Sequence, residues 1–127
     1  MSFKSPLNRV IGLGTAKDGA SHWWHQRVTA IALLPLGLWF AFSLLAVDMS
    51  SHSALNAWIG EPITAVLLIL TVSCLIYHSF LGVRVVVEDY VASKAIKVIG
   101  LLLSSFAHAF LAAVCLISIL KIALGSG

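Results

Sequence analysis

The sequence predicts an all-α integral membrane protein, a bundle of three transmembrane helices. The first observation is composition: of 127 residues, 60% are hydrophobic and only 10% are charged, with a mean hydropathy of +1.01. Soluble domains carry roughly 25% charged residues, so a soluble enzyme and a disordered chain are both excluded. The second is that three apolar stretches can each cross about 30 Å of hydrocarbon, which takes roughly 20 helical residues. We expect one domain, residues 1–127.

The three spans are expected at residues 28–47, 63–87 and 98–124. The first contains no charge, and Pro62 stands before the second at a favoured helix-start position. The later two are rich in Val, Ile and Leu, which also suit strands. Their length favours helices, and three strands cannot close a barrel in lipid.

The segments outside the spans are short. Residues 12–21 predict a polar lead-in, and residues 48–61 an exposed loop with a turn of helix around 54–60. Cys74 and Cys115 both sit in apolar runs. They are interpreted as small buried hydrophobes, because no disulfide framework or thiolate metal motif surrounds them.

Basic residues predict the orientation. The first loop carries two acids and no Lys or Arg, whereas basic residues precede the first span and surround the second connection: Lys4, Arg9, Lys17, Arg27, Arg84, Lys94 and Lys97. By the positive-inside rule, the N-terminus lies in the cytoplasm and the C-terminus in the periplasm. A polar lead of about 27 residues is too long for a cleaved signal, which indicates a bacterial inner-membrane protein, with a mitochondrially encoded protein as the alternative. The net charge is +3, but the basic residues are too few and too scattered for nucleic-acid binding.

His78 lies about ten residues into the second span, roughly 15 Å deep at 1.5 Å per residue. It can make an interhelical hydrogen bond or act as an axial ligand of haem iron. Gly82 lies on the same helix face, where a glycine would let a flat macrocycle approach the backbone. Ordinary small-residue packing is the alternative for Gly82.

Asp89 and Tyr90 follow His78 at the cytoplasmic boundary. Asp89 lies eleven residues on, nearly three turns, so it shares the face of His78 about 16 Å away. A phenol hydroxyl can donate to a quinone carbonyl, and a carboxylate can orient it or relay protons. The alternative is an interfacial tyrosine anchor beside solvated charges. Arg27 and Arg84 suit carboxylate partners such as haem propionates, or serve only as topology signals.

Two further groups have open interpretations. His22, Trp23, Trp24 and His25 precede the first span and predict an interfacial belt, part of which would border a quinone pocket. His108 lies at nearly the depth of His78. It predicts a packing hydrogen bond, with an iron clamp between His78 and His108 as the alternative.

The segment from His78 to Tyr90 resembles the hallmark of the small cytochrome b membrane anchor subunit of succinate dehydrogenase. In that family a span-two histidine is followed by glycine four residues later and by Asp-Tyr eleven and twelve residues later, and this chain has the same spacing. Residues 23–30, with Arg27, Thr29 and Ala30 in an Arg-x-Thr-Ala pattern, resemble the start of the family's first helix.

The resemblance implies half of a heterodimeric haem b anchor, paired with a second three-helix cytochrome b anchor subunit, which gives the other axial histidine. It implies docking of an iron–sulfur subunit and a flavoprotein subunit, with electrons passing from succinate to ubiquinone. His78 would be the iron ligand, and Arg27 would lie near the haem or the quinone, which agrees with the haem environment of Arg27, Gly82 and Arg84 suggested above. Tyr90, supported by Asp89, would bind the quinone.

The chain itself is expected to be non-catalytic, because it contains no flavin motif and no cysteine pattern for iron–sulfur clusters. A quinol:fumarate reductase anchor is the close alternative. A small transporter or channel subunit, with His78 and His108 as a proton relay, is another. A purely structural membrane protein is the third.

Overall fold

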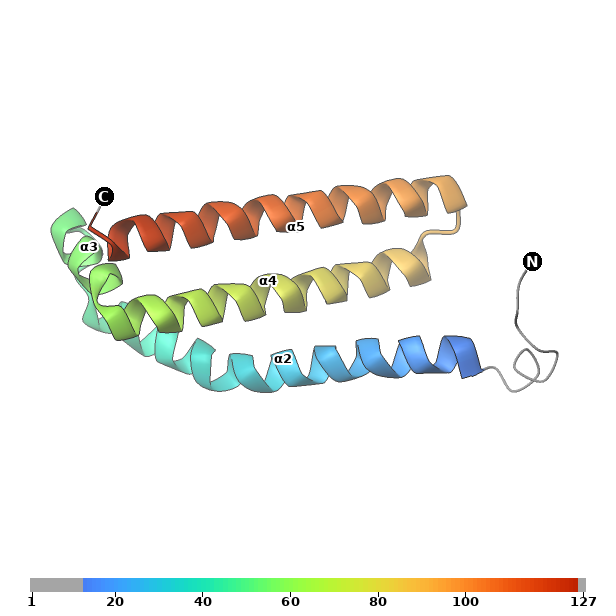
Figure 1. Cartoon of the computed structure of the whole chain (residues 1–127), viewed down its shortest axis with the longest axis horizontal. Coiled ribbons are helices and arrows are strands. Elements are labelled where there is room, and N and C mark those ends of the chain that lie inside the picture. The colour runs from blue at the N-terminus through green and yellow to red at the C-terminus, as the bar shows by residue number, and fades with distance from the viewer. Residues whose placement is uncertain (1–12, 126–127) are drawn as a thin grey trace.

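The computed structural model describes residues 13–125, with side chains from Gly19 onward (Figure 1). The helices are α2 (Leu13–Ala46), α3 (His52–Gly60), α4 (Pro62–Tyr90) and α5 (Lys94–Ala123), and the described residues contain no strand. The helices α2, α4 and α5 are each long and apolar enough to cross a membrane. The prediction of an all-α protein with three membrane-spanning helices is confirmed.

The three long helices stand in a row, with α4 between α2 and α5 (Figure 1). In the described part of the chain, α2 and α5 make no close backbone contact with each other. The short helix α3 packs across one end of α4 and α5, and the α4–α5 connection lies at the opposite end. The middle helix therefore carries nearly all the packing within the bundle.

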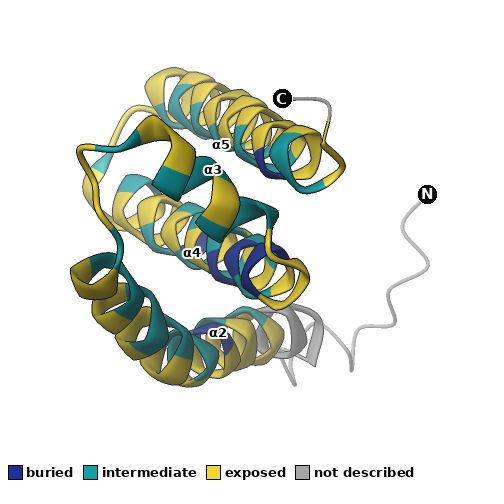
Figure 2. Ribbon diagram, turned by 90° about the vertical axis from the view of Figure 1, so that its left-hand side faces the viewer, coloured by how far each residue is buried: buried dark blue, intermediate teal, exposed yellow. Residues whose placement is uncertain are grey.

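Only a small core is buried, and most of it belongs to α4 (Figure 2). Ala65 and Leu68 of α4 pack with Ile119 of α5 near the α3 end. Around them lie partly buried aromatic side chains, with Trp39 of α2 stacked on Trp58 of α3 at 6.3 Å between ring centroids. The outer faces are apolar and exposed, which suits contact with lipid tails or another apolar subunit.

The helices run further than the apolar stretches. Because α2 begins at Leu13, the described part of the expected polar lead-in at residues 12–21 is helical. A helix already formed in the membrane adds each outer residue with one more hydrogen bond, so polar and glycine residues extend it at little cost. At the other boundary, α4 continues through Tyr90, which places Asp89 and Tyr90 in its last turn.

Capping side chains mark where α3 and α4 begin. Ser51 accepts a hydrogen bond from the backbone N–H of Ala54 at 3.2 Å, and this begins α3 within the expected loop. Glu61 accepts one from the backbone N–H of Thr64 at 2.7 Å, and Pro62 follows at the first helical position of α4. These hydrogen bonds from Thr64 hold the pKa of the Glu61 carboxyl below its ordinary value of 4.5.

This cap predicts a pH-dependent contribution to stability. A lowered pKa means that the Glu61 carboxylate stabilises the fold fully above pH 4.5, and that this contribution disappears as the pH falls through the folded-state pKa. We expect Glu61→Gln to lower the unfolding temperature at pH 7, measured by circular dichroism in mild detergent, and the difference to be smaller at about pH 3. A difference of equal size at both pH values would contradict this assignment.

Candidate functional site

Four polar side chains lie on the part of α2 that meets α4. His22 lies three and four residues before His25 and Gln26, and Thr29 lies four and three residues after them, so the four side chains form one polar stripe. The stripe meets α4 at Tyr77, His78 and Gly82.

His78 is held by a buried hydroxyl of the neighbouring helix. Its Nδ1 lies 2.9 Å from Oγ1 of Thr29, and that oxygen lies 2.8 Å from the carbonyl oxygen of His25. The hydroxyl has one proton, which we assign to the His25 carbonyl because that contact is the shorter. The Thr29 oxygen then accepts from Nδ1–H, which leaves the lone pair of His78 on Nε2.

Gln26 occupies the space at the other end of the ring. Its Nε2 lies 3.3 Å from Nε2 of His78, in position to donate to that lone pair. Its Oε1 is buried and has no hydrogen-bond partner among the described residues. The same amide nitrogen lies 3.8 Å from where a Cβ of residue 82 would stand. A methyl group would make ordinary contact there, so the packing of this chain alone does not require Gly82.

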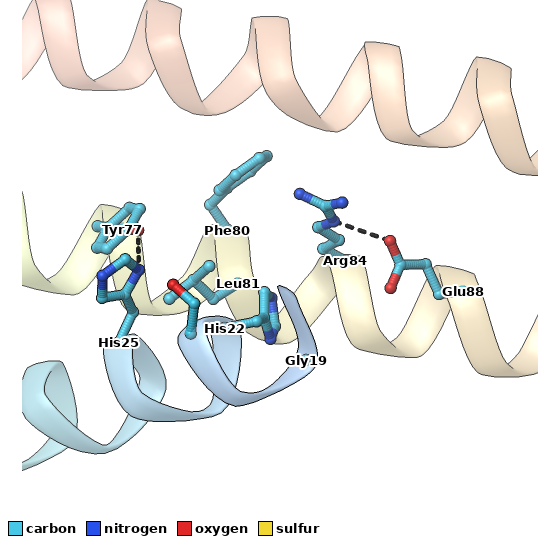
Figure 3. Close-up of a pocket in the computed structure, with 9 residues that line it drawn as sticks. Gly19, His22, His25, Tyr77, Phe80, Leu81, Arg84 and Glu88 are labelled. Atoms are coloured by element: carbon cyan, nitrogen blue, oxygen red, sulfur yellow. Dashed lines mark hydrogen bonds and ion pairs between the residues drawn. The ribbon is translucent and has the colours of Figure 1, made fainter. Parts of the chain in front are cut away.

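A groove of about 550 Å³ runs along the same seam between α2 and α4 (Figure 3). Within it the Tyr77 hydroxyl lies 3.1 Å from Nδ1 of His25, and Nε2 of His22 is buried without a partner among the described residues. The groove therefore gathers polar groups between two helices that are otherwise apolar. It is lined by Gly19, Ser21, His22, His25, Tyr77, Phe80, Leu81, Arg84 and Glu88.

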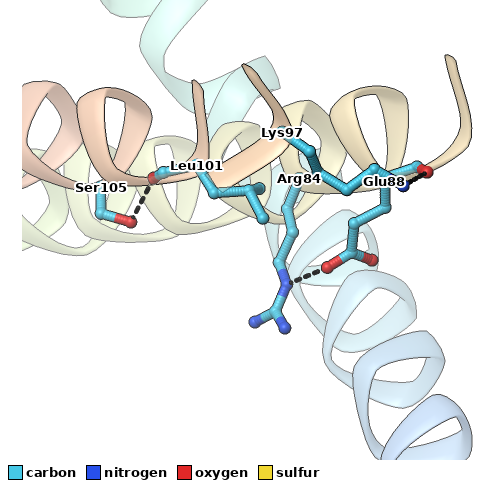
Figure 4. A network of polar contacts seen from close by, with 5 residues as sticks. All are labelled: Arg84, Glu88, Lys97, Leu101 and Ser105. Atoms are coloured by element: carbon cyan, nitrogen blue, oxygen red, sulfur yellow. Dashed lines mark hydrogen bonds and ion pairs between the residues drawn. The ribbon is translucent and has the colours of Figure 1, made fainter. Parts of the chain in front are cut away.

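Arg84 reaches this groove from the end of α4. Its Nε donates to Oε1 of Glu88 at 2.8 Å, and the Nζ of Lys97 donates to the backbone carbonyl of Glu88 at 2.6 Å (Figure 4). Nearly half of the Arg84 side chain is exposed, so this ion pair contributes little to stability and can exchange partners readily. Lys97 ties the start of α5 to the end of α4.

The other predicted site residues, Arg27, Asp89 and Tyr90, do not lie in the groove or beside His78. The Arg27 guanidinium lies 5.2 Å from the ring centroid of Trp23 on its own helix. Asp89 and Tyr90 are exposed at the end of α4, with 83% of Tyr90 accessible. Trp23 and Trp24 are also exposed, as an interfacial belt requires. Of the six predicted residues, the structure places His78 and Gly82 together and Arg84 in the adjacent groove.

His108 contacts different neighbours from His78. Its Nδ1 donates to the backbone carbonyl of Ser104 at 2.8 Å, and its Nε2 accepts from Oγ of Ser79 at 3.2 Å. It thus bridges α5 to α4, while His78 contacts α2. No clamp forms between the two imidazoles, and the residues described contain no cluster of three or more His, Cys, Asp or Glu that could hold a metal ion.

Thr29, Gln26 and Tyr77 received no role from the sequence. Thr29 and Gln26 lie within residues 23–30, and their spacing with His22 already places them on one face of a helix. Which residues of α4 that face would meet depends on how the two helices pack, which the spacing does not contain.

Comparisons with known proteins agree with the fold. A family model described as succinate dehydrogenase/fumarate reductase transmembrane subunit matches residues 1–120. Proteins named succinate dehydrogenase hydrophobic membrane anchor subunit are 35% identical over 96 residues in Rickettsia conorii and 33% over 95 residues in Rickettsia bellii, each match covering 75% of this chain and 76% of the relative. The Paracoccus denitrificans protein of that name is 31% identical over 90 residues, covering 71% of this chain and 70% of its own. No solved structure matches the chain significantly.

The contacts of His108 predict a purely structural role. We expect His108→Phe to remove the hydrogen bond between α5 and α4 and to lower the free energy of unfolding by about 1 kcal/mol, measured by denaturation in mixed micelles. Ser105→Ala is the control, because the Ser105 hydroxyl bonds only the Leu101 carbonyl within α5 (Figure 4). Equal stability of the wild type and His108→Phe would contradict this role.

Proposed function

The chain belongs to the succinate dehydrogenase/fumarate reductase transmembrane subunit family, and we propose that His78 binds haem b while Tyr90 and Asp89 help form a quinone-reduction site. As a multi-pass membrane anchor subunit of succinate dehydrogenase, it would hold the complex in the membrane and complete the electron path from succinate to quinone.

The state of the His78 ring is the observation that carries the haem proposal. A histidine that binds a metal presents one nitrogen to it and donates the other N–H to a neighbouring acceptor. With the proton assigned to Nδ1, as argued above, His78 donates to Thr29 and keeps its lone pair on Nε2. Beside it, the buried Oε1 of Gln26 and Nε2 of His22 lack partners in the described part of the chain. Buried polar atoms without partners are rare in folded proteins, so they support a further group at this seam.

Haem, when bound, supplies a one-electron carrier inside the hydrocarbon layer. The residues around His78 would bind and orient it. Gly82 leaves the backbone of α4 approachable on the same face, since no Cβ stands there. Arg84 can turn from the exposed Glu88 to a propionate, because surface ion pairs exchange at little cost. Arg27 has a guanidinium at the exposed surface of α2 and could make a similar contact.

The end of α4 suits quinone chemistry. Tyr90 is exposed in the last turn of a membrane-spanning helix, where its hydroxyl can donate to a quinone carbonyl and water can supply protons. The neighbouring Asp89 can orient that hydroxyl or pass protons to it. Both side chains are open to contact with other subunits at this end.

The bundle needs partners to enclose a flat cofactor. A single row of helices covers His78 from α2 alone, which leaves the other side of the site to another chain. We assign that place to a second cytochrome b anchor subunit, which would supply the second axial histidine. The iron–sulfur and flavoprotein subunits would dock at the end of α4, on the cytoplasmic side of a bacterial inner membrane. The N-terminus would face the cytoplasm and the C-terminus the periplasm.

The description of the family covers both directions of the reaction, so an anchor that serves a quinol:fumarate reductase is the second candidate. The relatives from the two Rickettsia species and Paracoccus denitrificans carry the name succinate dehydrogenase, which favours the first direction. A transporter with a relay from His78 to His108 is not favoured, because the two rings contact different neighbours.

His78→Ala tests the haem proposal directly. The complex, purified through a C-terminal tag in mild detergent, should show a b-type haem band that succinate reduces. We expect this band to be lost in His78→Ala and kept in His108→Phe, because the His108 ring bonds Ser104 and Ser79 rather than any group beside His78. An unchanged band in His78→Ala would overturn the assignment of His78 as a ligand.

Tyr90→Phe tests the quinone proposal by removing one hydroxyl and keeping the ring. Losing one hydrogen bond to the quinone should slow succinate:quinone reductase turnover by about tenfold. Reduction of a soluble dye by succinate should stay constant, because it does not use the anchor. Ser118→Ala is the control for loss of a hydroxyl, since the Ser118 hydroxyl donates only to the Val114 carbonyl within α5. Equal quinone turnover in Tyr90→Phe and the wild type would contradict the role of Tyr90.

A further inference from the structure

We propose that Thr29 and Gln26 prepare His78 for its metal: Thr29 fixes the ring with its proton on Nδ1, and the Gln26 amide covers Nε2 until iron displaces it. Thr29 is a positioning residue in this scheme and Gln26 a displaceable cap. The inference rests on the proposed role of His78 as a haem ligand, and it goes further by naming the residues that set the chemistry of that ligand.

Thr29 is suited to this task because its own helix fixes its hydroxyl. Only 8% of the residue is accessible, and Oγ1 lies 2.8 Å and 3.1 Å from the carbonyl oxygens of His25 and Gln26. A threonine in a helix commonly donates to such a carbonyl of the preceding turn. Its single proton is then committed, so the oxygen can only accept from the neighbouring helix. Of the two neutral forms of His78, only the one with Nδ1–H satisfies that oxygen.

Thr71 shows the same local geometry without a histidine. Its hydroxyl donates to the Leu67 carbonyl at 2.7 Å, and 7% of the residue is accessible. Thr71, on α4, is therefore a suitable control for Thr29, because it is equally buried and its hydroxyl makes the same bond within its helix.

The hydrogen bond to Thr29 also tunes the ligand. Donation from Nδ1–H makes Nε2 a stronger electron donor, and outer hydrogen bonds of this kind raise metal affinity by about 10–100-fold. A stronger donor favours the ferric state, so loss of the hydrogen bond should make the haem potential more positive.

Gln26 is held loosely at the other end of the ring. Its amide nitrogen makes a 3.3 Å contact with Nε2 of His78, and its buried Oε1 has no partner in the described part of the chain. Because the Gln26 amide makes one weak hydrogen bond and leaves its buried oxygen without a partner, it can move away from His78 at little cost. The amide keeps Nε2 from being an unsatisfied acceptor before the metal arrives, and it must move aside when the metal binds there.

The Thr29 arm of the test uses the purified complex with Thr29→Val, Thr29→Ser and Thr71→Val. We expect Thr29→Val to lose haem to a scavenger such as apomyoglobin, with affinity reduced about 10–100-fold, and to have a more positive midpoint potential. Thr29→Ser should restore both values, because serine keeps the hydroxyl, and Thr71→Val should match the wild type. Thr29→Ala replaces the valine variant if that variant does not assemble.

The Gln26 arm measures uptake of added haemin by complex made in haem-deficient cells. Gln26→Ala should take up haemin faster than the wild type, because nothing has to leave Nε2. Equal or slower uptake would overturn the cap. Unchanged potential and haem retention in Thr29→Val would overturn the positioning role, while loss of haem in His78→Ala would still support the ligand itself. Retention of the haem band in His78→Ala would instead overturn the proposed function on which the inference depends.

Discussion

The structure depends on one constraint, which is that polar groups inside a hydrocarbon layer must find partners within the protein. For the backbone, the constraint produces three long helices, since each helix bonds its own N–H and C=O groups. For side chains, it produces hydrogen bonds between helices, and these hold the row of helices together at specific points. His78 meets Thr29 between α4 and α2, and His108 meets Ser79 between α5 and α4.

Because α4 is the middle helix, it makes both of these contacts and carries most of the buried core. The same arrangement leaves the outer faces of α2 and α5 apolar and exposed, ready for lipid or for another subunit. The site follows from this asymmetry. α2 contacts His78 through its polar stripe, and the partner subunit that we propose would lie on the other side.

Much of the site could be predicted from residue type and spacing. His78 and Gly82 are four residues apart, so helical periodicity alone places them on one face, and the structure agrees. The sequence did not indicate that α2 would begin as early as Leu13, because composition describes whether a segment enters lipid, not where its helix ends. Thr29 and Gln26 were missed as partners of His78 because they lie 49 and 52 residues away from it in the chain.

The sequence by itself determined the class of the protein and the number of its spans, and it singled out the residues for which a role is proposed. These follow from hydropathy and from intervals within one helix, which are local properties. Only the tertiary structure decided that Thr29 lies beside Nδ1 of His78, that Gln26 lies beside Nε2, and that His108 bridges α5 to α4. The physical reason is that the packing of two helices selects which faces meet, and this choice sets which groups lie within hydrogen-bond distance of each ring nitrogen.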